Sequence, residues 1–257
     1  MTETRQHFST FRERLLRRER LIGTFVKLPT TQVIEMLGEL GYDFIIIDQE
    51  HAALDRGITD LMILAARAAN LAPVVRIPEF TPSHVLSALD SGAMGIMVPH
   101  VASVEKAEAI ARASHYGGGE RGFVGVSRAS NWGRVGSVQH MEQQDTQVVV
   151  FAMIEDQHAV DAAVDIARVP GVDALFIGRG DLTASFGKDP EASGKVAEIS
   201  RRVAAAAQEA DVPLMMLPTS RSDCEFAVSL GATALVLSSD HGFIRTAAAA
   251  AIRDIVV

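Results

Sequence analysis

The run Phe44-Ile45-Ile46-Ile47 constrains the fold more than any other part of the chain. Four successive large apolar residues cannot alternate between a core and solvent, so a strand built from them must be covered on both faces. Such strands occur in parallel sheets flanked by helices, and their carboxyl-terminal ends carry function. The run ends in Asp48, Glu50 and His51. Each of these side chains taken singly is more typical of a strand end or a helix cap, but the three together indicate a site.

The same alternation of strand and helix recurs along the chain. Strands are expected at residues 21–27, 44–48, 73–78, 95–99, 148–155, 174–178, 213–217 and 234–238, each followed by a helix. About eight such units, with no GxGxxG segment after the first strand, favour a single α/β domain over residues 1–257 that closes into a (β/α)8 TIM barrel. A doubly wound open sheet is the alternative. Residues 116–146 break the rhythm, and we expect them to pack on the barrel or against a neighbouring subunit.

Composition excludes several classes of partner. The formal net charge of −8 and the pI of about 5.5 argue against nucleic acid. No apolar run reaches the ~18 residues of a membrane span, and no signal segment is visible at the start of the sequence. The single cysteine, Cys224, has no internal disulfide partner. We therefore expect a cytoplasmic protein that inserts into no membrane.

Ionisable residues follow several of the other predicted strands. Glu155 ends the fifth strand and Asp181 comes shortly after the sixth. Two carboxylates, completed by water and substrate, suit Mg²⁺ or Mn²⁺, although both residues fit helix caps equally well. Arg76 stands in an apolar strand, where a guanidinium needs a carboxylate or a ligand because an unpaired buried charge is very costly. Asp90 stands at a helix end whose dipole disfavours it, which indicates a pairing with a histidine.

Several segments resemble the HpcH/HpaI aldolase family, which is related to citrate lyase β subunits. The segments are Phe-Ile-Ile-Ile-Asp-Gln-Glu-His-Ala, Pro-Val-Val-Arg, Leu-Asp-Ser-Gly-Ala, Val-Pro-His-Val, Glu-Arg-Gly-Phe, Met-Ile-Glu-Asp and Gly-Val-Asp-Ala-Leu-Phe-Ile-Gly-Arg-Gly-Asp-Leu. They occur in the family's order from about Gly23 to the last helix. The resemblance implies a metal-dependent (class II) aldolase on a (β/α)8 barrel. It also implies a homohexamer, a trimer of dimers that exchange their C-terminal helices.

The resemblance also implies a role for individual residues. Glu155 and Asp181 would hold a divalent metal, Mg²⁺ or Mn²⁺ with Co²⁺ as a further candidate. Arg76 would contact the keto oxygen of a pyruvate-type 2-oxo acid, whose partner substrate would be an aldehyde. His51 would transfer protons with Asp90 orienting it, and Asp48 would organise water on the metal.

Physical reasoning adds to this the main-chain amides of Gly180 and Asp181, which begin a helix and can receive the substrate carboxylate. Two positions depart from the family pattern, because Met153 replaces a glutamine and Arg179-Gly180 replaces a Pro-Ala pair. Arg179 adds a cation beside the site, and we expect it to favour substrates with a second carboxylate. Two alternatives stay open, namely a citrate-lyase-like enzyme acting on a CoA thioester or oxaloacetate and a barrel that binds a small acid without turnover.

Overall fold

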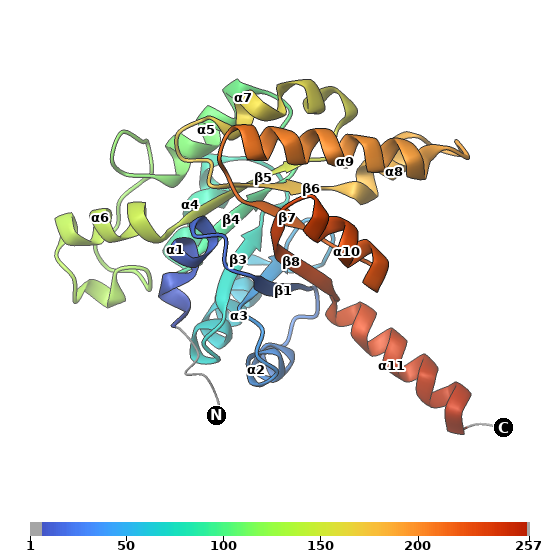
Figure 1. Ribbon diagram of the computed structural model, residues 1–257. Helices are drawn as coiled ribbons and strands as arrows, with labels where there is room; N and C mark the ends of the chain where they lie inside the picture. The colour runs from blue at the N-terminus through green and yellow to red at the C-terminus, as the bar shows by residue number, and fades with distance from the viewer. Residues whose placement is uncertain (1–6, 256–257) are drawn as a thin grey trace.

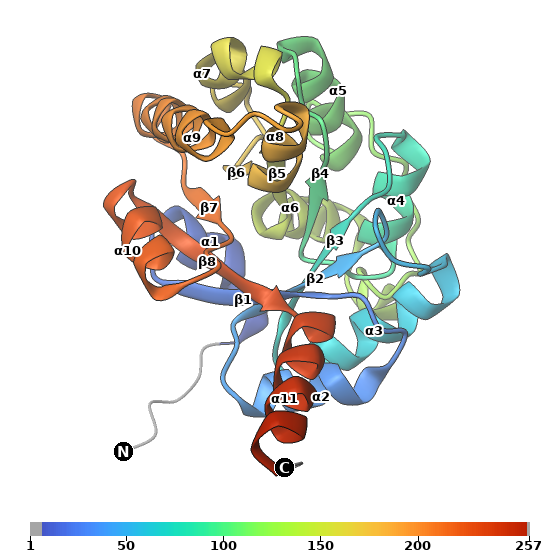
Figure 2. The same cartoon turned by 90° about the vertical axis from the view of Figure 1, so that its right-hand side faces the viewer.

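A closed parallel barrel forms the centre of the molecule (Figures 1 and 2). The computed structural model describes residues 7–255, and the strands in this range follow one another around the barrel in chain order. They are β1 (Leu21–Val26), β2 (Phe44–Asp48), β3 (Ala72–Arg76), β4 (Gly95–Val98), β5 (Val149–Ile154), β6 (Ala174–Ile177), β7 (Leu214–Met216) and β8 (Ala232–Ser239). The predicted barrel is confirmed, and an open sheet is excluded because β8 pairs with β1.

Helices surround the barrel and connect the strands. They are α1 (Phe11–Leu16), α2 (Thr31–Glu39), α3 (Arg56–Ala68), α4 (Pro82–Asp90), α5 (Val104–Ser114), α6 (Ser137–Gln147), α7 (Ala163–Ala167), α8 (Arg179–Ser185), α9 (Ala192–Glu209), α10 (Arg221–Ser229) and α11 (Asp240–Ile255). Short 3-10 turns lie at Phe8–Thr10, Asn131–Gly133 and Gln157–Ala162. Among the described residues, no helix combines the length and the apolar character that crossing a bilayer requires.

The strands bury both of their faces, as the run at residues 44–47 requires. Phe44 and Ile46 point into the barrel and join the interior cluster that contains Phe151. Ile45 and Ile47 belong to a second cluster between the strands and the helices. Side chains on a strand alternate strictly between its two faces, so the residue two positions beyond an interior residue also faces the barrel axis. This alternation decides which residues reach the site.

The two ends of the barrel are built differently. Phe11 of α1 lies 5.3 Å from the Phe44 ring and 6.3 Å from the Phe151 ring between centroids, which closes the end where the strands begin. α6 packs against α1, so the segment that interrupts the repeat lies on the barrel. α11 projects away from the body of the molecule (Figure 1), and Asp240 is its only buried residue within the described range.

Candidate active site

Four charged residues reach the open end of the barrel because they continue the inward-facing series of their strands. Lys27 follows Phe25, Asp48 follows Ile46, Arg76 follows Val74 and Glu155 follows Met153, each two positions beyond an interior residue. Asp48 and Arg76 are also register partners across β2 and β3. The closed sheet therefore brings residues that are far apart in sequence to one rim.

Asp48 is fully buried and is the centre of a paired network. Arg76 donates to both of its oxygens, from Nε to Oδ1 at 2.9 Å and from Nη2 to Oδ2 at 2.7 Å. Lys27 Nζ lies 3.0 Å from Oδ2, and the main-chain N–H of His51 donates to Oδ1. Burial alone would disfavour the charged carboxylate, but these bonds outweigh it and hold the pKa of Asp48 below its ordinary value. The network keeps Asp48 ionised and fixes Arg76.

Glu155 has the opposite surroundings. Its side chain is buried, and only the main-chain N–H of His100 donates to Oε1, at 2.7 Å. Oε2 is buried and has no hydrogen-bond partner. Burial, reinforced by the negative charges of Asp181 and Glu50, raises the pKa of Glu155 to about 7. The imidazole of His100 has Nδ1 at 3.6 Å from Oε1 and balances the carboxylate only when it is protonated, whereas a bound cation would supply a permanent counter-charge.

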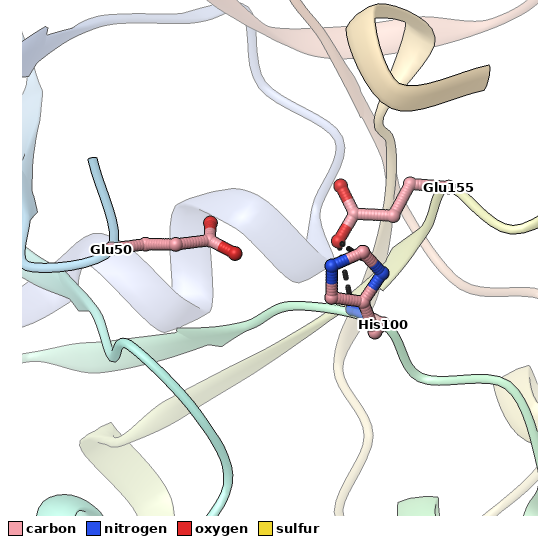
Figure 3. A group of neighbouring side chains, drawn as sticks. All are labelled: Glu50, His100 and Glu155. Carbon is pink, nitrogen blue, oxygen red and sulfur yellow. Dashed lines mark hydrogen bonds and ion pairs between the residues drawn. The ribbon is translucent and has the colours of Figure 1, made fainter. Parts of the chain in front are cut away.

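The residues around Glu155 fit a divalent metal. Glu50, His100 and Glu155 each offer one ligand atom, and these atoms lie within 4.8 Å of one another (Figure 3). Gly178 leaves space for this arrangement, because a Cβ there would lie 2.4 Å from Oε2 of Glu155. Asp181, in the first turn of α8, is exposed and outside this group, although its charge acts on Glu155. Carboxylate oxygens with one imidazole are ordinary ligands of Mn²⁺ and related ions, and oxygens alone suit Mg²⁺.

His51 lies at the rim of the same opening. Its imidazole is half exposed and its Nε2 lies 3.6 Å from Oε2 of Glu50, which in turn lies 3.0 Å from Nη1 of Arg76. The ring is thus within reach of solvent and of the paired network. This placement suits a proton-transfer group, since histidine changes charge near neutral pH.

Asp90 lies elsewhere in this chain. It ends α4, which runs back toward the starting ends of the strands, and its Oδ1 lies 3.4 Å from Nη2 of Arg121. Burial raises the pKa of Asp90, although the nearby positive charges of Arg121 and His140 oppose this. Asp90 therefore has a histidine neighbour, but it is His140; among residues 7–255 no ion pair joins Asp90 to His51. The orientation of His51 by Asp90 therefore stays a prediction, because within this single chain the two side chains form no ion pair among the described residues.

Arg179 is not a free cation. Its guanidinium donates to both oxygens of Asp223, at 2.6 and 2.7 Å, and to the carbonyl of Leu217 at 2.6 Å. The hydrogen bonds from Arg179 lower the pKa of Asp223 to about 2. Arg179 thus ties the start of α8 to α10 beside the site, and a substrate carboxylate would have to compete with Asp223 for it.

A cavity of about 1030 Å³ opens at this end of the barrel. Its wall includes Lys27, His51, Arg76 and Glu155 together with Gly180 and Asp181. The wall also carries apolar side chains and hydroxyl groups, namely Phe25, Met153, Phe176, Leu217, Phe226, Thr183, Ser193, Thr219, Ser222, Ser238 and Ser239. The volume is at the upper end of the range of small-molecule sites, so two small substrates fit at once.

Sequence reasoning missed two residues of the site. Lys27 ends the first expected strand, and the structure shows that it continues the inward-facing series of Leu21 and Phe25. His100 follows Pro99 and has a left-handed backbone with φ of 54°. No local pattern predicts that conformation, because it depends on contacts with Glu155 and Lys106 that the fold creates.

Comparison with known proteins finds relatives over most of the chain. A family model described as HpcH/HpaI aldolase/citrate lyase matches residues 21–247. A 5-keto-4-deoxy-D-glucarate aldolase from Enterobacter sp. (strain 638) is 31% identical over 243 residues, covering 92% of this chain and 93% of the relative. A hydroxypyruvate/pyruvate aldolase from Paraburkholderia phytofirmans is 33% identical over 204 residues, covering 76% of this chain and 78% of the relative.

A solved structure is similar over nearly the whole chain. It is that of a HpcH/HpaI aldolase/citrate lyase family protein from Burkholderia cenocepacia J2315, with a TM-score of 0.89 and 30% sequence identity. The match covers 96% of this chain and 99% of that one. The likeness therefore includes the strand ends that carry the candidate site.

Proposed function

Because the chain belongs to the HpcH/HpaI aldolase/citrate lyase family, we propose that it is a metal-dependent aldolase, a carbon–carbon lyase that joins or separates a pyruvate-type enolate and an aldehyde. The observation that carries this proposal is that a positively charged side chain and an uncompensated carboxylate lie at the same rim of the barrel. Arg76 stands fixed and charged, and Glu155 stands buried without a counter-charge. Such a rim binds a cation and an anionic substrate side by side.

The residues divide the chemistry between them. A divalent ion held by Glu155 and Asp181 would supply a Lewis acid that polarises the keto group of a 2-oxo acid. Arg76 faces the cavity and stabilises the negative charge that develops on the keto oxygen as the enolate forms. The amides of Gly180 and Asp181 receive the substrate carboxylate. Asp48 holds Arg76 in place and orients water near the ion.

His51 moves the proton. In the cleavage direction it accepts the proton of the C4 hydroxyl group while the C3–C4 bond breaks, and the bonding electrons pass to the 2-oxo fragment. The product aldehyde then leaves through the open end of the barrel, and the enolate takes up a proton to give the 2-oxo acid. The half-exposed position of His51 allows it to exchange protons with solvent between turnovers.

The side chains that line the cavity suit an aldehyde with several hydroxyl groups. Hydroxyl side chains such as Thr183, Ser193 and Ser238 stand on it beside Phe25 and Phe176. Hydroxyl groups match the donors and acceptors of a sugar-derived fragment, and the aromatic rings cover its carbon chain. The named relative that acts on 5-keto-4-deoxy-D-glucarate fits this character. We propose 2-keto-3-deoxy sugar acids and their relatives as the substrate class.

We propose a homohexamer of dimers that exchange α11. Three large apolar residues of this helix, Ile244, Ile252 and Ile255, are more than half exposed in the single chain. A helix of this kind gains stability when a second copy covers it. Light scattering would measure the assembly, and truncation before Phe243 is expected to reduce it to smaller species.

Pyruvate release from 2-keto-3-deoxy acids tests the function, followed through lactate dehydrogenase after chelation and readdition of Mg²⁺ or Mn²⁺. We expect metal-dependent cleavage that falls below detection in Glu155→Gln and Asp181→Asn, because the ion loses an anionic ligand in each. Asp211→Asn is the control, since Asp211 is exposed and pairs with Arg18 away from the cavity. Full activity in either ligand variant would remove the metal assignment.

A further inference from the structure

His100 lies beside the proposed metal ligand in a conformation that its surroundings enforce. Its backbone has φ of 54°, a left-handed conformation that costs a residue with a side chain about 1–2 kcal/mol. In return, its N–H donates to Oε1 of Glu155 at 2.7 Å, and its carbonyl accepts from Nζ of Lys106 at 2.8 Å. The strain fixes the direction in which the imidazole leaves the backbone.

The imidazole stands next to the carboxylate that lacks a counter-charge. Figure 3 shows the ring beside the carboxylate of Glu155, with the Glu50 side chain extending toward the pair from across the opening. Ligand atoms around one small divalent ion lie about 3–4 Å apart, so a modest inward movement of these side chains satisfies a shared ion. Glu155 Oε2 is buried without a hydrogen bond, whereas Glu50 Oε2 lies 3.0 Å from Nη1 of Arg76 in an ion pair.

The carboxylate of Asp156 lies beside the ring and favours one of its tautomers. Its Oδ2 lies 3.2 Å from Nδ1 of His100, close enough to accept a hydrogen bond from an Nδ1–H group. That tautomer leaves the lone pair on Nε2, and metal-bound histidines are commonly oriented by a carboxylate in this way. The arrangement thus has a ligand nitrogen and the partner that orients it.

We propose that His100 is a nitrogen ligand of the divalent ion, beside Glu155, and that it makes the site prefer Co²⁺ or Mn²⁺ to Mg²⁺. This inference rests on the proposed metal-dependent function. Imidazole binds first-row transition ions well, whereas Mg²⁺ favours oxygen.

Calorimetric titration of metal-free protein with Co²⁺ and with Mg²⁺ tests the preference. His100→Gly removes the imidazole but keeps the N–H and accepts the left-handed backbone, so the bond to Glu155 survives. We expect this variant to weaken Co²⁺ binding by roughly 10–100-fold and Mg²⁺ binding by much less. His100→Asn, which also tolerates this φ, serves as a second variant. Equal losses for the two ions would overturn the proposal.

Pulsed electron paramagnetic resonance of the Mn²⁺-loaded protein detects the nitrogen directly. We expect ¹⁴N modulation from a coordinated imidazole in the native protein, its loss in His100→Gly, and its retention in His51→Gln, which removes a second imidazole that lies at this rim. Mn²⁺ binding without ¹⁴N modulation would overturn the role of His100 and leave the aldolase proposal standing. Failure of the native protein to bind any of the three ions would overturn both.

Discussion

The two halves of the barrel rim differ in how their charges are balanced. On the β2–β3 side, Asp48 is buried but receives bonds from Arg76 and Lys27. On the β4–β6 side, Glu155 is equally buried but receives one main-chain N–H and faces two further acids. The charges of the first half are balanced within the protein, whereas under the proposed function a bound cation would balance those of the second half. A buried ionisable group without a charged partner, such as Glu155, is therefore a better indicator of a functional site than a buried group that is fully paired, such as Asp48.

Replacing Arg76 removes the main counter-charge of Asp48 on the β2–β3 side. Arg76→Met leaves Asp48 with Lys27 as its only side-chain partner, and we expect the free energy of unfolding to fall by about 3 kcal/mol or more. Urea denaturation measures the change. The double variant Asp48→Leu/Arg76→Met removes both charges and is expected to recover most of the stability. A loss below about 1 kcal/mol in the single variant would mean that the pair is no better than a surface ion pair.

His51 lies between the two halves of the rim, and replacing it tests whether it transfers protons during catalysis. Its N–H belongs to the Asp48 network while its ring faces Glu50. His51→Ala is expected to slow aldol cleavage by about 10²–10⁴, the usual contribution of a positioned acid–base group. Steady-state kinetics measure kcat, with His84→Ala as a control from the first turn of α4, outside the residues that line the cavity. An unchanged kcat would return His51 to a structural role.

In the metal-free protein, replacing Glu155 should increase stability, whereas replacing Arg76 should decrease it. Its pKa of about 7 in the folded state exceeds its ordinary 4.5, so folding loses stability as pH rises through this interval. The full penalty is roughly 3 kcal/mol, reached above pH 7. Glu155→Gln should therefore raise the Tm of the metal-free protein at pH 8 and change it little at pH 4.5. Equal Tm values for Glu155→Gln and the native protein at pH 8 would show that the ionised Glu155 does not destabilise the fold.

The ion pair between Arg179 and Asp223 lies outside both halves and should have the smallest effect. The pKa of Asp223 is lowered to about 2, so the pair's stabilisation is present above pH 4 and is lost as pH falls toward 2. Solvent screening limits it to about 1 kcal/mol. Asp223→Asn should cost this amount at pH 7 and much less at pH 2 in denaturant titrations. A pH-independent difference would contradict the electrostatic account.

The same pair bears on substrate choice. If Arg179 recognised a second carboxylate, Arg179→Ala would raise KM for an acidic substrate more than for a neutral one. Because Asp223 already occupies the guanidinium, the structure favours equal effects on both substrates. Paired KM measurements on acidic and neutral 2-keto-3-deoxy compounds distinguish the two outcomes.

Much of this rim follows from sequence because strand alternation is a local rule. An uninterrupted apolar run predicts a covered strand, and the charged residues at its end predict a site there. The pairing of Asp48 with Arg76 depends on the register between β2 and β3, which only the structure gives. The segment 116–146 was unpredictable in detail, since α6 forms where α1 offers a surface. The partner of Asp90 was equally hidden, because Arg121 reaches it from a loop 31 residues away. Contacts that join distant loops have no local signal.

Exchange of the methyl protons of pyruvate for deuterium tests the central claim most directly. Enolate formation needs the cation-binding half and Arg76 but no aldehyde, so the half-reaction should proceed alone. With Mg²⁺, Mn²⁺ or Co²⁺ in D₂O, we expect the methyl signal of pyruvate to disappear in NMR spectra, and we expect EDTA or Arg76→Ala to suppress the loss. No exchange with any of the three ions, or exchange of acetyl-CoA protons in place of those of pyruvate, would contradict the account.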